Sequence, residues 1–145
     1  MNTIVKAMED YKNQFVLILA GYPDEMDDFL QTNPGLPSRF PIRFDFPDYT
    51  VDQLVQIAGM MLQEREYVLA PQAEWKLRRQ VAQEKEQSPY AFSNGRFIRN
   101  LLEKALRNQA VRLLRQSEET PSKQELMILR PEDLSFERVK GNDFK

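Results

Sequence analysis

The sequence of 145 residues contains no cysteine and no histidine. Without cysteine, the chain can form neither a disulfide framework nor a reactive thiolate. Without histidine, it lacks the most common general base, proton shuttle and zinc ligand. Any chemistry must therefore depend on carboxylates, arginines, lysines, hydroxyls or backbone groups.

Long apolar segments and a large net charge are missing from the sequence as well. The longest apolar run, FVLILA at 15–20, is far too short to span a bilayer, and the N-terminal stretch has no signal-peptide pattern. The 20 basic residues are balanced by 22 acidic ones, which argues against a nucleic-acid or membrane partner. The composition is that of an ordinary globular protein, and we expect it to be cytoplasmic.

Residues 1–49 have the pattern of an α/β domain. The continuous apolar run at 15–20 is typical of a strand buried on both faces of a parallel sheet, and the alternation at 42–46 predicts a second strand. Short helices are expected over 4–11 and 24–31. Two strands cannot supply a sheet that is covered on both faces, so we expect further strands of the same domain to precede Met1.

Residues 50–118 are predicted to be all helical. Thr50 and Gln53 have the spacing of a capping box at the start of a helix. Pro71 suits the first turn of a second helix, which runs to about Gln87, and a long basic helix is expected over 95–115.

The last segment, 119–145, is predicted to be a C-terminal tail with a polar linker, a short strand at LMIL and a helical turn at RPEDL. The predicted fold class is therefore an α/β fragment, the end of a parallel-sheet core, followed by an all-α helical subdomain. The chain should be mostly helical overall.

Two candidate sites lie in the first 49 residues. Gly21 and Tyr22 follow the apolar strand at its carboxyl end, where ligands of parallel sheets usually lie; the alternative is an ordinary strand-to-helix turn. Arg39 is the lone cation of the turn-rich loop NPGLPSRFP, 33–41. Such an arginine usually meets only water or a surface carboxylate.

A third candidate site is the start of the long helix. Ser93 or Asn94 can cap this helix, and Arg96 and Arg99 fall in its first turn. The N-terminus of a helix already carries partial positive charge, so cations there are destabilising unless an anion binds among them. A helix N-terminus with two arginines suits a phosphate group; a solvated basic face is the alternative.

Other nucleotide and metal motifs are not found in the sequence. None of the five glycines precedes a lysine, so there is no G-x-x-x-x-G-K-[ST] phosphate loop. No aspartate leaves a predicted strand end directly, as a magnesium ligand should. We therefore predict no metal ligand in this chain.

Taken in order, VLILAGYPDEM, NPGLPSRF, FDFPDYT and FSNGRFIRNLLEKALRNQAVRLL resemble the CbxX/CfqX-type branch of the AAA+ ATPases, and within it the sporulation-related members most closely. The resemblance extends over about 4–134. It implies a hexameric ring that binds ATP with magnesium, hydrolyses it and remodels a protein substrate, whose identity the sequence does not reveal. It also identifies 50–118 as the helical lid.

The resemblance assigns roles to the candidate residues. Arg39 matches the arginine finger, which reaches the nucleotide of the neighbouring subunit, and Arg96 matches the sensor-2 arginine, which touches nucleotide in its own subunit. Arg99 is a second candidate beside it. Gly21 and Tyr22 occupy the sensor-1 position, where many AAA+ proteins have asparagine or threonine.

The family's phosphate loop, acidic magnesium motif and pore loop have no counterpart in this sequence. We therefore expect the chain to be the C-terminal part of the ATPase, unable to bind nucleotide tightly or to hydrolyse it alone. Two alternatives are a stand-alone helical adaptor module and a nucleic-acid binder that uses the basic helix. The sequence pI of about 5.3 weighs against the second.

Overall fold

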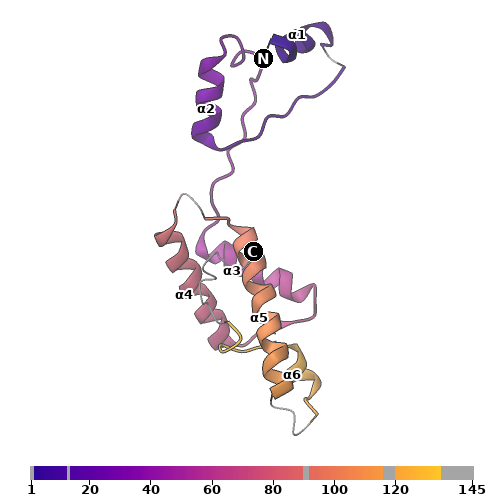
Figure 1. The fold of residues 1–145 in the computed structure, drawn as a ribbon, viewed down its shortest axis with the longest axis vertical. Helices are drawn as coiled ribbons and strands as arrows, with labels where there is room; N and C mark the ends of the chain where they lie inside the picture. The colour runs from indigo at the N-terminus through magenta and orange to yellow at the C-terminus, as the bar shows by residue number, and fades with distance from the viewer. Residues whose placement is uncertain (1, 13, 90–91, 116–119, 135–145) are drawn as a thin grey trace, which may run out of the picture. The chain divides into compact units, whose positions relative to one another are not determined.

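The computed structural model describes residues 2–12, 14–89, 92–115 and 120–134 (Figure 1). The chain divides into two compact units, Met1–Pro47 and Asp48–Lys145. No helix in these described ranges is both long and apolar enough to cross a membrane.

The first unit contains α1 (Asn2–Asp10) and α2 (Pro23–Thr32), as the sequence predicted. Helix α2 begins with a proline in its first turn, followed by two acidic residues that favour the N-terminal end of the helix dipole. At its C-terminal end, the Thr32 hydroxyl donates to the Asp28 carbonyl at 2.7 Å and the Asn33 amide donates to the Phe29 carbonyl at 2.8 Å. These side chains add hydrogen bonds to backbone carbonyls near the C-terminal end of the helix.

The two strands predicted in this unit are not formed. Residues 15–20 and 42–46 belong to no β-strand, and they leave large apolar side chains exposed, such as Val16 at 86% and Phe46 at 92%. A strand exists only through hydrogen bonds to a neighbouring strand, and no described segment pairs with either stretch. The apolar patterns are real, but within this chain they do not produce a sheet.

The second unit is built around three helices, α3 (Val51–Gln63), α4 (Pro71–Gln87) and α5 (Gly95–Arg115). The mostly helical character predicted for this part of the chain is confirmed, but a strand of two residues at 68–69 lies between α3 and α4, so 50–118 is not all helical. The predicted capping box is present at the start of α3: the Gln53 N–H donates to the Thr50 hydroxyl at 3.2 Å, and the Thr50 N–H donates to the Gln53 side chain at 2.9 Å.

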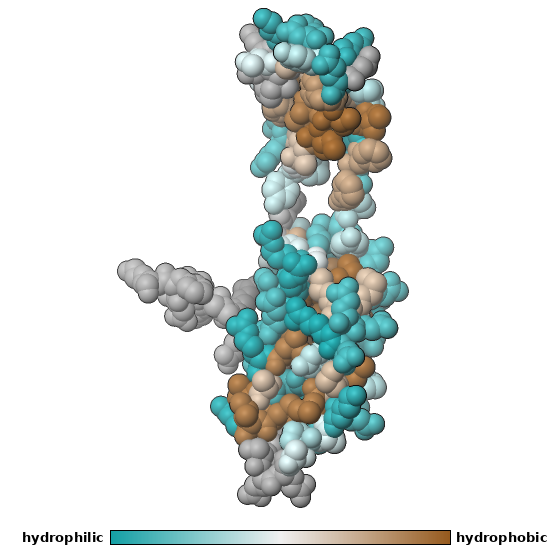
Figure 2. All heavy atoms as spheres, turned by 90° about the vertical axis from the view of Figure 1, so that its right-hand side faces the viewer, coloured by the Kyte–Doolittle hydropathy of each residue, from teal (hydrophilic) through white to brown (hydrophobic). Residues whose placement is uncertain are grey.

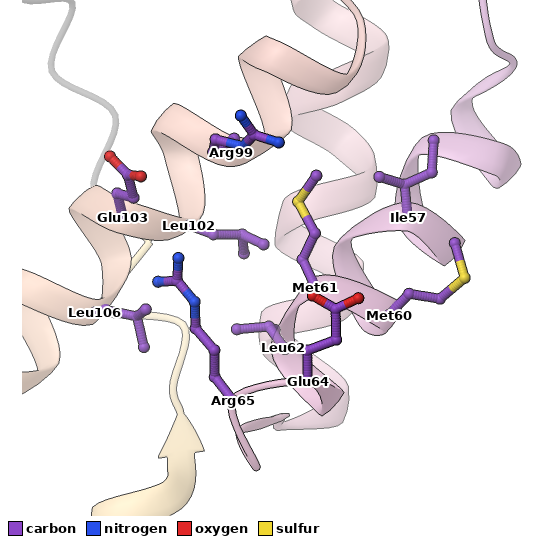
Figure 3. A pocket seen from close by; sticks show the side chains of 10 residues that line it. All are labelled: Ile57, Met60, Met61, Leu62, Glu64, Arg65, Arg99, Leu102, Glu103 and Leu106. Atoms are coloured by element: carbon purple, nitrogen blue, oxygen red, sulfur yellow. The ribbon is translucent and has the colours of Figure 1, made fainter.

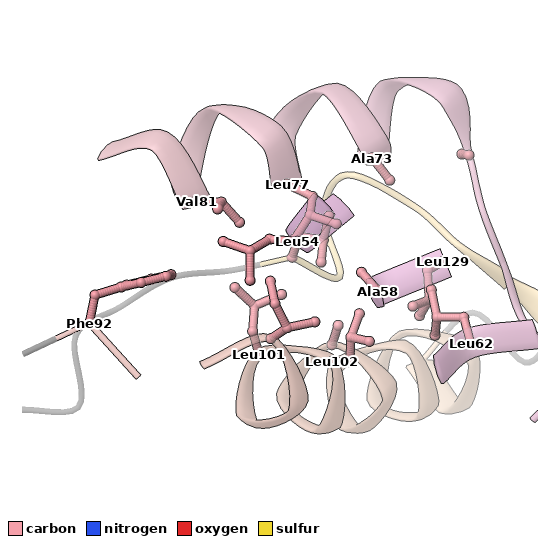
Figure 4. Packing of buried hydrophobic residues seen from close by; sticks show 14 residues of the cluster. Leu54, Ala58, Leu62, Ala73, Leu77, Val81, Phe92, Leu101, Leu102 and Leu129 are labelled. Carbon is pink, nitrogen blue, oxygen red and sulfur yellow. The ribbon is translucent and has the colours of Figure 1, made fainter. Parts of the chain in front are cut away.

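Apolar side chains of the three helices meet in one core, shown in Figure 4. Its buried members come from every helix of the bundle and include Leu54, Ala58, Leu77, Val81, Ile98 and Leu102. Burying a leucine or isoleucine side chain contributes roughly 1.5–3 kcal/mol relative to leaving it in water. This core positions the start of α5, where the candidate arginines lie.

The segment after α5 joins the same core. Helix α6 (Lys123–Met127) leads into β2 (Ile128–Leu129), which pairs in parallel with β1 (Val68–Leu69). Leu129 and Leu134 are buried among the helices. The strand predicted at LMIL is therefore confirmed for its last two residues, whereas α6 lies partly in what was predicted to be a polar linker. The rest of the predicted tail, from 135 onward, lies outside the described residues.

Candidate functional site

Arg39 lies in a compact turn and is engaged by its own unit. The turn closes over the buried Leu36, with Arg39 N–H donating to the Leu36 carbonyl at 2.9 Å. The Arg39 Nη1 donates to the Gly35 carbonyl at 2.9 Å, and Nη2 donates to the Glu9 carboxylate on α1. The Arg39 side chain is 31% exposed and that of Glu9 is 60% exposed.

Gly35 makes this arrangement possible. Its φ of +89° lies in the left-handed region, which favours glycine, and a Cβ there would lie 2.9 Å from the Arg39 Nη1. Sequence reasoning identified Arg39 but missed both Gly35 and Glu9. A glycine in a turn-rich loop could have indicated a left-handed backbone at Gly35. Glu9, in contrast, is 30 residues from Arg39 in sequence, and only the fold brings it near.

Gly21 and Tyr22 form the entry to α2. Tyr22 is the N-cap residue, its carbonyl accepts from the Met26 N–H at 2.9 Å, and its side chain makes no capping hydrogen bond. Both residues are exposed. The predicted turn after 15–20 is therefore present, although no strand precedes it.

Arg96 and Arg99 both lie in the first turns of α5 with exposed side chains. Neither forms an ion pair with any residue that the structure describes. The side chain of Asn94, which was predicted as a possible cap of α5, has a different partner. Asn94 precedes α5, yet its side-chain oxygen accepts from the Tyr49 N–H at 3.0 Å instead of capping α5 itself.

Arg99 lines a groove of about 600 Å³ between the C-terminal half of α3 and the first half of α5 (Figure 3). Apolar side chains of Met61, Leu102 and Leu106 form part of its wall. The charged members of the lining are two arginines and two glutamates: Arg65, Arg99, Glu64 and Glu103. Arg96 is not part of this lining, so the groove brings only one of the two arginines to a concave surface.

The described residues of the two units bring no acidic cluster together. Across the described ranges there is no group of three or more carboxylates, histidines or cysteines that could hold a metal ion. The arginines could contact phosphate oxygens through charge-assisted hydrogen bonds. What the arginine side chains can offer an anionic ligand is positive charge.

Residues 50–143 match the AAA lid domain family. The chain belongs to this family. Its relatives confirm the CbxX/CfqX-type branch of the AAA+ proteins, because they carry the names CfxQ and CbbX. The helices α3, α4 and α5, with the β1–β2 pair, are thus the lid of an AAA+ protein.

Three relatives illustrate the similarity. The chain is 53% identical over 137 residues to stage V sporulation protein K of Bacillus subtilis, covering 94% of this chain and 42% of that protein. It is 39% identical over 136 residues to protein CbbX of Cereibacter sphaeroides, covering 94% and 43%. It is 38% identical over 136 residues to the chloroplastic ribulose bisphosphate carboxylase/oxygenase activase of Cyanidioschyzon merolae, covering 94% and 46%. The chain therefore spans less than half the length of these relatives.

Proposed function

We propose that this chain supplies the C-terminal part of an AAA+ ATPase, whose hexameric ring uses ATP hydrolysis to remodel a partner protein. The observation that carries the proposal is the match of the lid, 50–143, to the AAA lid domain. It is supported by the names of relatives, one of which is an activase of another enzyme. In this proposal ATP binds with magnesium, and the phosphate loop and acidic magnesium motif, which have no counterpart in this sequence, belong to another part of the full-length ATPase.

Within this function, Arg39 acts as the arginine finger on a neighbouring subunit. Its guanidinium has to leave Glu9 and the Gly35 carbonyl to reach a phosphate. In the pair with Glu9, Arg39 is partly exposed and Glu9 is exposed, and solvent-accessible ion pairs contribute only about 0–1 kcal/mol. A phosphate with two or more negative charges can therefore displace Glu9 at small cost.

Arg96 acts as the sensor-2 residue in its own subunit, with Arg99 as a second contact. Arg96 is exposed beside the positive end of the α5 dipole. A phosphate group there would offset both the charge of Arg96 and the partial positive charge of the helix N-terminus. Gly21 and Tyr22 stand at the sensor-1 position. Because Tyr22 is 73% exposed and its phenol hydroxyl can donate and accept hydrogen bonds, it is the group there that could contact the attacking water or phosphate.

The experiment that tests this proposal substitutes each arginine in the full-length protein. Arg39→Ala should leave nucleotide affinity nearly intact and slow hydrolysis by about 10³ or more, the usual value of a trans arginine. Arg96→Ala should weaken nucleotide binding, since a hydrogen bond to a charged group contributes roughly 1.5–3 kcal/mol. Arg43→Ala is the matched control, because Arg43 is an exposed arginine paired with Asp27 and Asp45 in the same unit.

Mixed rings distinguish action in trans from action in cis. An Arg39→Ala subunit retains its own nucleotide site, so a neighbour with an intact Arg39 and a disabled phosphate loop should restore hydrolysis. If mixed rings form and hydrolysis is not restored, Arg39 is an ordinary surface arginine. If the full-length protein hydrolyses no ATP at all, the proposed ATPase function is wrong and the chain is instead a helical adaptor module.

A further inference from the structure

Asn94 connects the beginning of the lid to the helix that carries Arg96. Its side-chain oxygen accepts from the Tyr49 N–H at 3.0 Å, and its side-chain nitrogen donates to the Asp48 carboxylate at 2.7 Å. These contacts join residues 45 and 46 positions apart in sequence. Asp48 and Tyr49, called the junction below, are the first residues of the second unit.

Helix α4 holds the junction from another side. Lys85 Nζ donates to the Tyr49 carbonyl, so the N–H and the C=O of Tyr49 are both engaged by side chains of the lid. The same ammonium group lies 5.7 Å from the centre of the Phe92 ring. Phe92 in turn packs against Phe97 of α5, with ring centres 5.3 Å apart. The junction is therefore fixed against both α4 and the start of α5.

Asn94 has a backbone conformation that glycine adopts more readily than asparagine. Its φ of 47° is in the left-handed region, which costs most residues about 1–2 kcal/mol and which glycine adopts most readily. Asparagine is tolerated there better than other side chains. A glycine would suit this backbone, but it would leave the Tyr49 N–H and the Asp48 carboxylate without these partners.

We propose that Asn94 is a positioning residue, which fixes the first turn of α5, and with it Arg96, relative to the junction. The inference rests on the proposed contact between Arg96 and nucleotide. Because Asp48 directly follows Pro47, a displacement of the chain at this point is passed through two hydrogen bonds to the turn that carries Arg96. Coupling of this kind is reciprocal, so nucleotide held by Arg96 also biases the position of the junction.

The first test exchanges the two hydrogen-bonding groups in the full-length protein. Asn94→Asp keeps an acceptor for the Tyr49 N–H but places a second carboxylate against Asp48. Affinity for a non-hydrolysable ATP analogue with magnesium should fall by about tenfold. In the double variant Asp48→Asn with Asn94→Asp, the new amide can donate to the new carboxylate. Affinity should then return to within about twofold of the parent.

Two controls assign the effect to Arg96. Gln72→Glu adds the same charge at an exposed position of α4 and should leave affinity unchanged. In an Arg96→Ala background, Asn94→Asp should weaken binding no further, because the residue that it positions is gone. Additive losses in the two variants would show that Asn94 does not act through Arg96.

The outcomes separate this inference from the proposed function. If Arg96→Ala binds the analogue as the parent does, the sensor-2 role fails. If Arg96→Ala weakens binding but Asn94→Asp does not, or the double variant fails to recover, the positioning role is overturned. Amide hydrogen exchange of this chain with Asn94→Gly, which retains the left-handed backbone, supplies a second measurement. Exchange at Tyr49 should become faster, and unchanged exchange would also overturn the inference.

Discussion

At the scale of single residues, one buried ion pair fastens the end of the lid to α5. Arg112 donates to both carboxylate oxygens of Asp133 at 2.8 and 2.9 Å, and Asp133 also accepts from the Arg130 N–H at 2.8 Å. The Asp133 side chain is 1% exposed and that of Arg112 is 11% exposed. The hydrogen bonds to Asp133 raise the pKa of Arg112, so its charge persists at every accessible pH.

Asp133→Ala should therefore destabilise the chain by about 3–5 kcal/mol, because it leaves a buried guanidinium without its counter-ion. Urea unfolding followed by circular dichroism measures this difference. The matched control is Asp52→Ala, which removes the exposed pair with Arg78 and should cost less than about 1 kcal/mol. Equal losses in the two variants would contradict a structural role for the buried pair.

At the scale of elements, the end of α3 has a residue that does not suit its backbone. Glu66 has a φ of 62°, and the Tyr67 N–H after it bonds back to the Leu62 carbonyl at 2.9 Å. This is the geometry in which helices usually end on glycine. Glu66→Gly should thus stabilise the chain by about 0.5–1 kcal/mol, measured by the midpoint of urea unfolding.

A nearby glutamate provides the control for this variant. Glu64 has a helical φ of −57° at the C-cap of the same helix, so Glu64→Gly should destabilise by up to about 1 kcal/mol. Opposite signs from two glutamates in one turn would identify backbone conformation as the cause. A loss of stability in Glu66→Gly would show that its side chain matters more than its φ.

The short helix α6 depends on a second capping box, between Ser122 and Glu125. Hydrogen bonds from the Ser122 backbone and hydroxyl lower the pKa of Glu125 below its ordinary value of 4.5. A carboxyl group whose pKa is lowered by folding stabilises the chain above its unfolded pKa and loses that contribution as pH falls through the folded pKa. Stability of the parent should therefore drop more between pH 5 and pH 3 than that of Glu125→Gln. Parallel pH profiles from thermal unfolding would refute the role of the charged cap.

At the scale of the whole molecule, the first unit exposes an unusual amount of apolar surface, seen as brown atoms in Figure 2. The exposed residues of the two extended segments are Phe15, Val16, Ile18, Ile42, Phe44 and Phe46. Apolar surface and unpaired backbone groups of this kind promote association between chains. We expect this chain to self-associate with rising concentration, in light scattering.

Two lysine substitutions test the source of this association. The double variant Ile18→Lys with Phe44→Lys should shift the chain toward the monomer. Both apolar side chains are exposed, and the lysines that replace them add positive charge to the two segments. Met60→Lys, at an exposed methionine of α3, is the control and should leave association unchanged. A parent chain that stays monomeric across a wide range of concentration would refute the expectation.

Local signals in the sequence were sufficient for α1 to α5, but α6 begins in what was predicted to be a polar linker. The bounds of α4 and α5, the Thr50–Gln53 capping box and the proline at the start of α4 depend on residues at most a few positions apart, and all were predicted correctly. The resemblance of the motifs also identified the family, which the lid match and the relatives confirm. The roles of Arg39, Arg96, Arg99, Gly21 and Tyr22 stay predictions.

Only the tertiary structure decided which distant segments meet. The apolar pattern at 15–20 predicts a strand correctly only if a partner lies beside it, and pairing is a property of two segments rather than one. For the same reason, the β1–β2 ladder between residues 60 positions apart could not be predicted. The contacts of Glu9 with Arg39 and of Asn94 with Tyr49 arise likewise when packing of helices brings remote polar groups together. The sequence by itself thus determined the helices α1 to α5 and the family, whereas the fold determined what each polar side chain touches.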